Sequence, residues 1–189
     1  MRTRDSSTNC GRPVDEHGRV DPPLNAGEFE TLVGFLEWQR STLAWKTEGL
    51  DQAGLTKAVP PASMTLGGIL KHMAWVEDHW FSFRLMGRER EDLWRSIDWV
   101  AEPDWEWTSA ADDSPDELRL LWTEAIGRSR TAVNDVFREG GLDRMVARVA
   151  EDGSAPSLRW VLVHMVEEYA RHNGHADFLR EAIDGQVGE

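Results

Sequence analysis

The sequence contains one cysteine among its 189 residues, Cys10, so no disulfide bond can form within the chain. Cys10 lies in a polar N-terminal segment, where we expect no ordered surroundings that would activate its thiol. It is therefore a poor candidate nucleophile. If the protein carries out thiol chemistry, we expect the sulfur to come from a small molecule.

Basic residues are also scarce. The chain has 21 Lys and Arg against 34 Asp and Glu, which gives a formal net charge of −13, and the basic residues form no stripe. Binding to duplex DNA or to anionic lipid depends on clustered Lys and Arg. We therefore expect neither a nucleic-acid nor a membrane partner.

Long hydrophobic runs are absent as well. No stretch reaches the roughly 18 apolar residues that a transmembrane helix needs. The N-terminal segment MRTRDSSTNCGRPVDEHGRVDPP lacks the apolar region of a secretory signal, so we expect a cytoplasmic protein. A length of 189 residues, with 40% hydrophobic and 29% charged residues, is typical of one globular domain.

The distribution of apolar residues predicts an all-α protein. Residues 1–26 are polar and interrupted by Gly and Pro, which indicates a flexible N-terminal extension. From residue 27 to residue 186, apolar residues recur at helical spacing and predict a four-helix bundle. The helices are expected at about 27–49, 65–87, 114–140 and 157–185. The sequence SPDE at 114–117 predicts a capping box with Ser114 as the N-cap.

A long acidic connection, residues 88–113, separates the second and third predicted helices. Its tryptophans include Trp94, Trp99, Trp105 and Trp107. A connection of this length is usually functional or partly structured. Its tryptophans could wall or cover a pocket, or they could simply pack over the bundle. The later segment 144–155 could be strand-like or irregular.

The last predicted helix carries ionisable side chains among apolar ones. His164, Glu168 and His172 follow one another at steps of four and therefore lie near one face. A buried carboxylate needs a cation or hydrogen-bond donors to offset the loss of water. The second helix carries His72 in an otherwise apolar context. Together, His72, Glu168 and His172 match the three-ligand sites that helical bundles can hold.

Two imidazoles and one carboxylate suit Zn²⁺, and Ni²⁺, Fe²⁺ or Mn²⁺ can use the same ligands. An open fourth position would make such a site catalytic rather than structural. The same spacing also fits a buried polar network, since Glu-x-x-x-His occurs by chance on many helices. Tyr169, Arg171 and Asp177 could support the site, form salt links or lie on the helix surface.

Two stretches, TLGGILKHMAWVEDHWFSFRLMG and LVHMVEEYARHNGHADFLREAIDG, resemble the DinB/YfiT-like superfamily of metal-binding four-helix proteins. The resemblance covers residues 27–186 and is strongest to the branch that includes mycothiol-dependent maleylpyruvate isomerase. It implies His72, Glu168 and His172 as the metal ligands. Most of the superfamily has a histidine at the position of Glu168, whereas this branch has a glutamate.

The resemblance assigns no role to His79, His164 or His175, and we expect them to be hydrogen-bonded polar groups. His175 could instead support the metal ligands or face the substrate. It implies a metal-dependent thiol S-transferase or isomerase, with mycothiol or a related small thiol as co-substrate and an electrophile as the second reactant. One alternative is a small hydrolase that uses a metal-activated water. Another is a non-catalytic metal-binding stress protein. A homodimer is compatible with each of these functions.

Overall fold

The computed structural model describes residues 12–188, so Cys10 lies outside the described residues. Within this range all regular structure is helical, and β-pairing is limited to two isolated bridges, Val14 with Val20 and Met145 with Ser157. The prediction of an all-α fold is therefore confirmed. None of the described helices has both the length and the apolar character of a membrane span.

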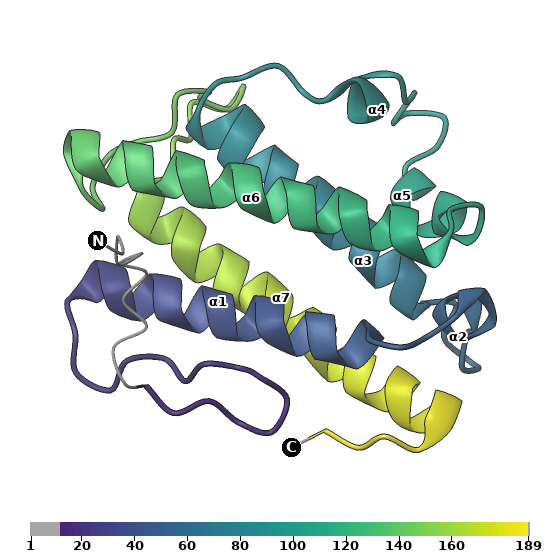
Figure 1. Ribbon diagram of the computed structural model, residues 1–189. Coiled ribbons are helices and arrows are strands. Elements are labelled where there is room, and N and C mark those ends of the chain that lie inside the picture. Colours follow the sequence, from purple (N-terminus) through teal and green to yellow (C-terminus); the bar gives the residue numbers. More distant parts are fainter. Residues whose placement is uncertain (1–11, 189) are drawn as a thin grey trace, which may run out of the picture.

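Four long helical segments form the bundle (Figure 1). They are α1 (Glu28–Thr47), α3 (Leu66–Glu77) with its continuation η1 (Asp78–Leu85), α6 (Pro115–Gly140) and α7 (Leu158–Asp184). α1 packs along α7, and α3 packs along α6. The core between them is aliphatic and aromatic, and it includes Leu36, Leu43, Ile69, Met73, Leu118, Val161 and Met165.

Short helices occupy the connections between the long ones. α2 (Gln52–Thr56) lies between α1 and α3, while α4 (Asp92–Arg95), α5 (Trp105–Thr108) and the 3₁₀-helix η2 (Ser109–Ala111) lie between η1 and α6. α5 and η2 pack against α3. The predicted long connection is therefore partly structured, and it covers one side of the helix that carries His72.

The helix ends follow the local sequence signals. At the start of α6, the Ser114 hydroxyl accepts a hydrogen bond from the Glu117 amide (3.3 Å), and the Glu117 carboxylate accepts one from the Ser114 amide (2.8 Å). This confirms the capping box. α7 begins after Ser157, whose side chain accepts from the Trp160 amide, and ends at Gly185, whose φ of +79° favours glycine. These ends fix which residues of α7 face α3.

The second predicted helix begins at Thr65 and ends near Gly87 as expected, but it is not a single α-helix. From Asp78 to Leu85 it is a π-helix, and just beyond it the Met86 amide donates to the Phe81 carbonyl, five residues earlier. The wider turn changes the direction of the side chains after Glu77 relative to a 3.6-residue repeat. The face of His79 therefore cannot be extrapolated from that of His72.

Residues 12–26 lie against α1. The Arg19 guanidinium lies over the rings of Trp38 and Trp45, and the imidazole of His17 stacks on Trp45 with 3.8 Å between ring centroids. The division into an extension, 1–26, and a bundle, 27–186, stays a prediction. The later segment 144–155 has no strand and is irregular.

Candidate metal centre

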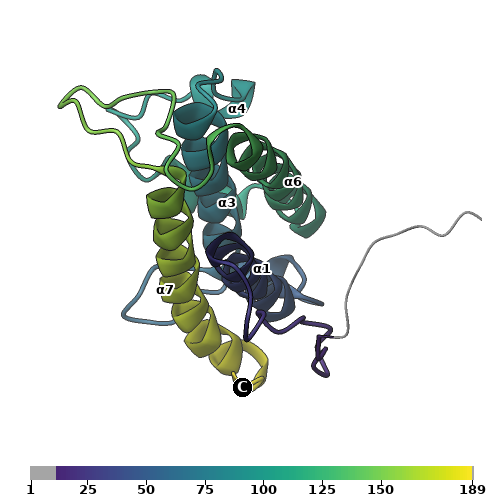
Figure 2. The same cartoon turned by 90° about the vertical axis from the view of Figure 1, so that its left-hand side faces the viewer.

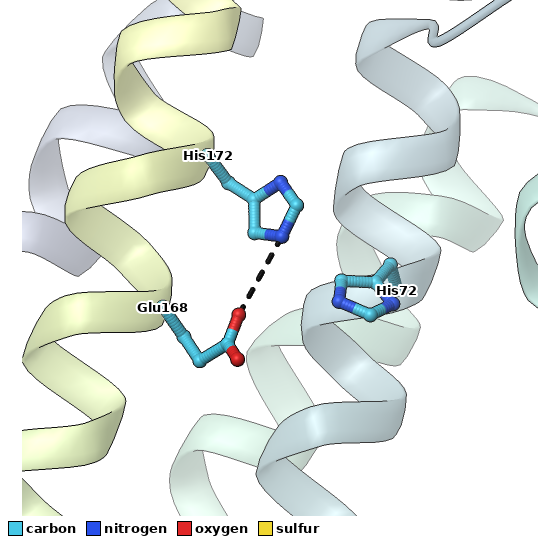
Figure 3. Close-up of side chains that lie close together, drawn as sticks. All are labelled: His72, Glu168 and His172. Carbon is cyan, nitrogen blue, oxygen red and sulfur yellow. Dashed lines mark ion pairs between the residues drawn. The ribbon is translucent and has the colours of Figure 1, made fainter.

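Three of the ionisable side chains expected at the site lie together between α3 and α7 (Figure 3). His72 comes from α3, and Glu168 and His172 come from successive turns of α7. Each offers one ligand atom, and these atoms all lie within 4.8 Å of one another. Helix packing has therefore brought together residues that are about a hundred positions apart in the sequence.

The distances within the candidate metal centre (His72, Glu168 and His172) suit a bound cation better than hydrogen bonding. His172 Nε2 lies 3.6 Å from Glu168 Oε2, which is too long for a hydrogen bond. Two ligands that are each about 2.0–2.2 Å from a tetrahedral Zn²⁺ lie roughly 3.3–3.6 Å apart. The other ring nitrogen of His172, Nδ1, is buried and has no hydrogen-bond partner among the described residues. The spacing of Nε2 and Oε2 therefore fits two ligands of one divalent cation.

The surroundings of His172 keep its imidazole neutral. Only 7% of this residue is exposed. Burial, with smaller contributions from His72 and His175, lowers the pKa of His172 to about 4. At neutral pH the imidazole of His172 is therefore uncharged, and one of its ring nitrogens has a lone pair that can bind a cation.

Glu106, which was not predicted as a site residue, contacts His72 through the ring nitrogen Nδ1. Its Oε1 lies 3.2 Å from His72 Nδ1, and the residue is 5% exposed. When Nδ1–H donates to this carboxylate, Nε2 of His72 is left free for the centre, as in many metal sites where a carboxylate orients a histidine ligand. The available signal was the sequence WEW, a carboxylate between two large hydrophobic residues.

The connection between η1 and α6 also places an aromatic ring on the candidate metal centre. Trp107 stacks on His72, with 4.3 Å between ring centroids. Gly68 allows this approach, because a Cβ there would lie 3.1 Å from Trp107 Cε3. Trp94, by contrast, is 1% exposed and belongs to the core. Trp107 therefore contacts a predicted ligand, whereas Trp94 packs within the core.

The remaining histidines differ in their relation to the centre. His164 stacks on Trp160, and its Nε2 lies 3.7 Å from Glu168 Oε1. The ring of His175 lies 5.6 Å from that of His172. His79 has another environment: its Nδ1 accepts a hydrogen bond of 2.9 Å from Arg90.

His164, Glu167 and Glu168 form a second group of possible ligands, with atoms within 4.8 Å of one another. Glu167, however, is exposed and pairs with Arg171 on the same helix. The group formed by His72, Glu168 and His172 is more buried and joins two helices. It is therefore the better candidate for a metal centre.

Comparison with known protein families agrees with this architecture. The model of the family described as Mycothiol-S-transferase matches residues 31–185. The chain belongs to this mycothiol S-transferase family. The match confirms the resemblance to DinB/YfiT-like proteins, and membership of the family implies a small thiol as a substrate. A search of curated proteins found no match. The assignment of His72, Glu168 and His172 as ligands stays a prediction.

Proposed function

We propose that this protein is a metal-dependent S-transferase that joins the sulfur of mycothiol, or of a related small thiol, to an electrophile. In this proposal His72, Glu168 and His172 hold a divalent cation, and Zn²⁺ suits the ligand set best. One observation carries the proposal. In a chain of this family, three donors from two helices converge, and the facing atoms of Glu168 and His172 are not hydrogen-bonded to each other.

A divalent cation at this site would lower the pKa of a thiol bound to it, so that the thiol ionises near neutral pH. The protein's own residues prepare the site for this chemistry. Glu106 orients the imidazole of His72 through Nδ1, and Trp107 covers a face of the same ring. The only cysteine of the chain is Cys10, so the proposed nucleophilic sulfur belongs to the substrate.

The test combines metal analysis with detection of the product. Wild-type protein is expected to contain one divalent ion per chain and to convert mycothiol and benzyl bromide to the thioether, detected by mass spectrometry. His172→Ala should lose the ion and at least about 100-fold of the rate, because a ligand is removed. His17→Ala is the control, since His17 stacks on Trp45 instead of facing the centre.

Metal-depleted protein that forms the thioether at the full rate would contradict the proposal. Product analysis without added thiol provides a second check. If the protein consumed the electrophile equally well under that condition and released the alcohol, it would be a hydrolase.

A further inference from the structure

An apolar cavity of about 260 Å³ lies between the C-terminal half of α7 and the segment that joins α2 to α3. Figure 2 shows this segment beside α7, and the Lys57 ammonium group donates a hydrogen bond of 3.0 Å to the Ala182 carbonyl. The lining residues are Val59, Ala62, Met64, His175, Phe178 and Leu179. Apart from His175 they are all hydrophobic. A polar molecule that entered the cavity would therefore lose hydrogen bonds to water and gain almost none from the protein.

The cavity approaches the candidate metal centre from two sides. On the side of α7, His175 lines the cavity, and its ring lies 5.6 Å from that of His172. On the side of α3, Met64 lines the cavity and also a neighbouring pocket that contains Trp107, the residue stacked on His72. His175 therefore lies between the cavity and His172, whereas Met64 and Trp107 both lie between the cavity and His72.

We infer that this cavity binds the electrophile and that the electrophile is a small apolar molecule. The inference rests on the proposed thiol transfer, which requires a second reactant beside the sulfur. A reacting carbon must come within about 3–3.5 Å of the sulfur. The cavity contains none of the three ligands, but it can hold the rest of such a molecule while its reactive end extends past His175 toward the centre.

The size and lining of the cavity define the class of molecule. An apolar cavity of about 150 Å³ is enough to bind benzene, so 260 Å³ accommodates one ring or a short alkyl chain. A charged or hydroxyl-rich molecule would lose its hydration and find only His175 as a polar partner. Phe178, which is 76% exposed, adds an apolar surface at the rim.

For an alkyl bromide the reaction is a simple substitution. A bond forms between the thiol sulfur and the carbon, while the carbon–bromine bond breaks and bromide leaves with the electron pair. The thiol proton passes to water. Each further methylene that the cavity buries should raise kcat/KM about fourfold until the cavity is full.

The first test measures kcat/KM for bromoethane, bromopropane and bromobutane at a fixed concentration of mycothiol. Ala62→Phe fills the cavity from an exposed position, and Ala58→Phe is its matched control, because Ala58 is exposed on the same segment but does not line the cavity. Wild type and Ala58→Phe should show the rise with chain length. Ala62→Phe should lose about tenfold or more for bromobutane, since the buried chain is displaced. The KM for mycothiol and the metal content should stay the same.

A second variant and a binding assay test the role of the cavity independently of Ala62→Phe kinetics. Phe178→Ser should also weaken the preference for bromobutane, and its exposed position leaves the core intact. Binding of unreactive ethylbenzene, followed by NMR, needs no turnover. The wild type should bind it, and Ala62→Phe should not.

If thiol transfer is absent with every electrophile, the proposed function fails, and the ethylbenzene result alone decides the role of the cavity. A flat series of kcat/KM values would overturn the inference. So would unchanged ethylbenzene binding by Ala62→Phe.

Discussion

Two groups of polar side chains lie between the helices of this bundle, and they differ in how their hydrogen-bonding atoms are used. In the first, Glu77 accepts from Arg40 Nε (2.8 Å) and Nη2 (2.7 Å) and from the Tyr169 hydroxyl (2.7 Å). The Tyr169 oxygen in turn accepts from Trp122 Nε1 (2.9 Å). We call these four residues the saturated network. The second group is the candidate metal centre, where the closest approach of Glu168 to His172 is 3.6 Å.

The two groups differ although they include adjacent residues of α7, Glu168 and Tyr169. Burial and the charge of Glu77 raise the pKa of Tyr169 well above its usual value. The hydroxyl therefore stays protonated and donates a hydrogen bond to the glutamate. Burial alone would lower the pKa of Arg40, but Glu77 holds it above its ordinary value. In the saturated network the charges are paired and the polar atoms are hydrogen-bonded. In the candidate metal centre, by contrast, Glu168 Oε2 and His172 Nε2 are not hydrogen-bonded to each other and can bind a cation.

The largest effect is expected from breaking the saturated network. Glu77→Ala leaves Nε and Nη2 of Arg40 buried without their carboxylate acceptor, and only Glu37 remains as an acidic partner of Arg40. This should cost about 3–5 kcal/mol of unfolding free energy. Tyr169→Phe is the milder comparison and should cost about 1–2 kcal/mol, since it removes a hydroxyl but leaves the ion pair. Urea unfolding of both variants checks these values. A loss below about 1 kcal/mol in Glu77→Ala would contradict the distinction between the two groups.

The candidate metal centre should respond to metal instead. Zn²⁺ at about 100 times its dissociation constant should raise the unfolding free energy of the wild type by about 2.7 kcal/mol, and a chelator should reverse this. His172→Ala and Glu168→Gln should show no such rise. Thermal unfolding with and without Zn²⁺ measures the difference. An equal rise in His172→Ala would show that the ion binds elsewhere.

A smaller effect is expected at Glu106, which touches the centre only through His72. Glu106→Ala should weaken Zn²⁺ binding about 10–100-fold, because the imidazole loses the partner of its Nδ1–H. Glu106→Gln, whose amide oxygen can still accept that hydrogen bond, should lie between Ala and the wild type. Glu102→Ala removes an exposed carboxylate from the same connection and serves as the control. Calorimetric titration with Zn²⁺ distinguishes the variants, and equal affinity in Glu106→Ala would rule out the positioning role.

Local signals in the sequence were enough to predict the four long helical segments. Ser114 and Ser157 act as caps, and Gly185 ends α7 as expected. The convergence of His72, Glu168 and His172 could also be predicted, because spacing on one helix and a family resemblance both point to it. Neither signal depends on knowing how the loops pack.

What could not be predicted depends on contacts between distant segments. Tyr169 was expected near the site or on the helix surface, yet it is fully buried, because its hydroxyl reaches Glu77 on another helix. Glu106 acquires its role only when α5 packs on α3. The π-helix after Glu77 is also invisible to a search for a 3.6-residue repeat.

The smallest effect is expected at His79, which belongs to neither group. One of its ring nitrogens, Nδ1, accepts a hydrogen bond from Arg90. Burial, then Arg90 and Arg84, lower the pKa of His79 from 6.5 to about 3. The unfolded chain therefore binds more protons between these values, so the contribution of His79 to stability is complete above pH 6.5 and is lost as the pH falls toward 3.

His79→Gln keeps an acceptor for Arg90 but cannot take up a proton. On acidification from pH 6.5 to 5, the metal-free variant should lose less stability than the wild type, by on the order of 1–2 kcal/mol. Urea unfolding across this pH range, with His17→Gln as the control, measures the difference. Parallel pH profiles for the wild type and His79→Gln would mean that His79 is protonated as easily in the folded protein as in the unfolded chain. The pairing with Arg90 would then have to open at acidic pH, unlike the saturated network, whose ion pair has no histidine to protonate.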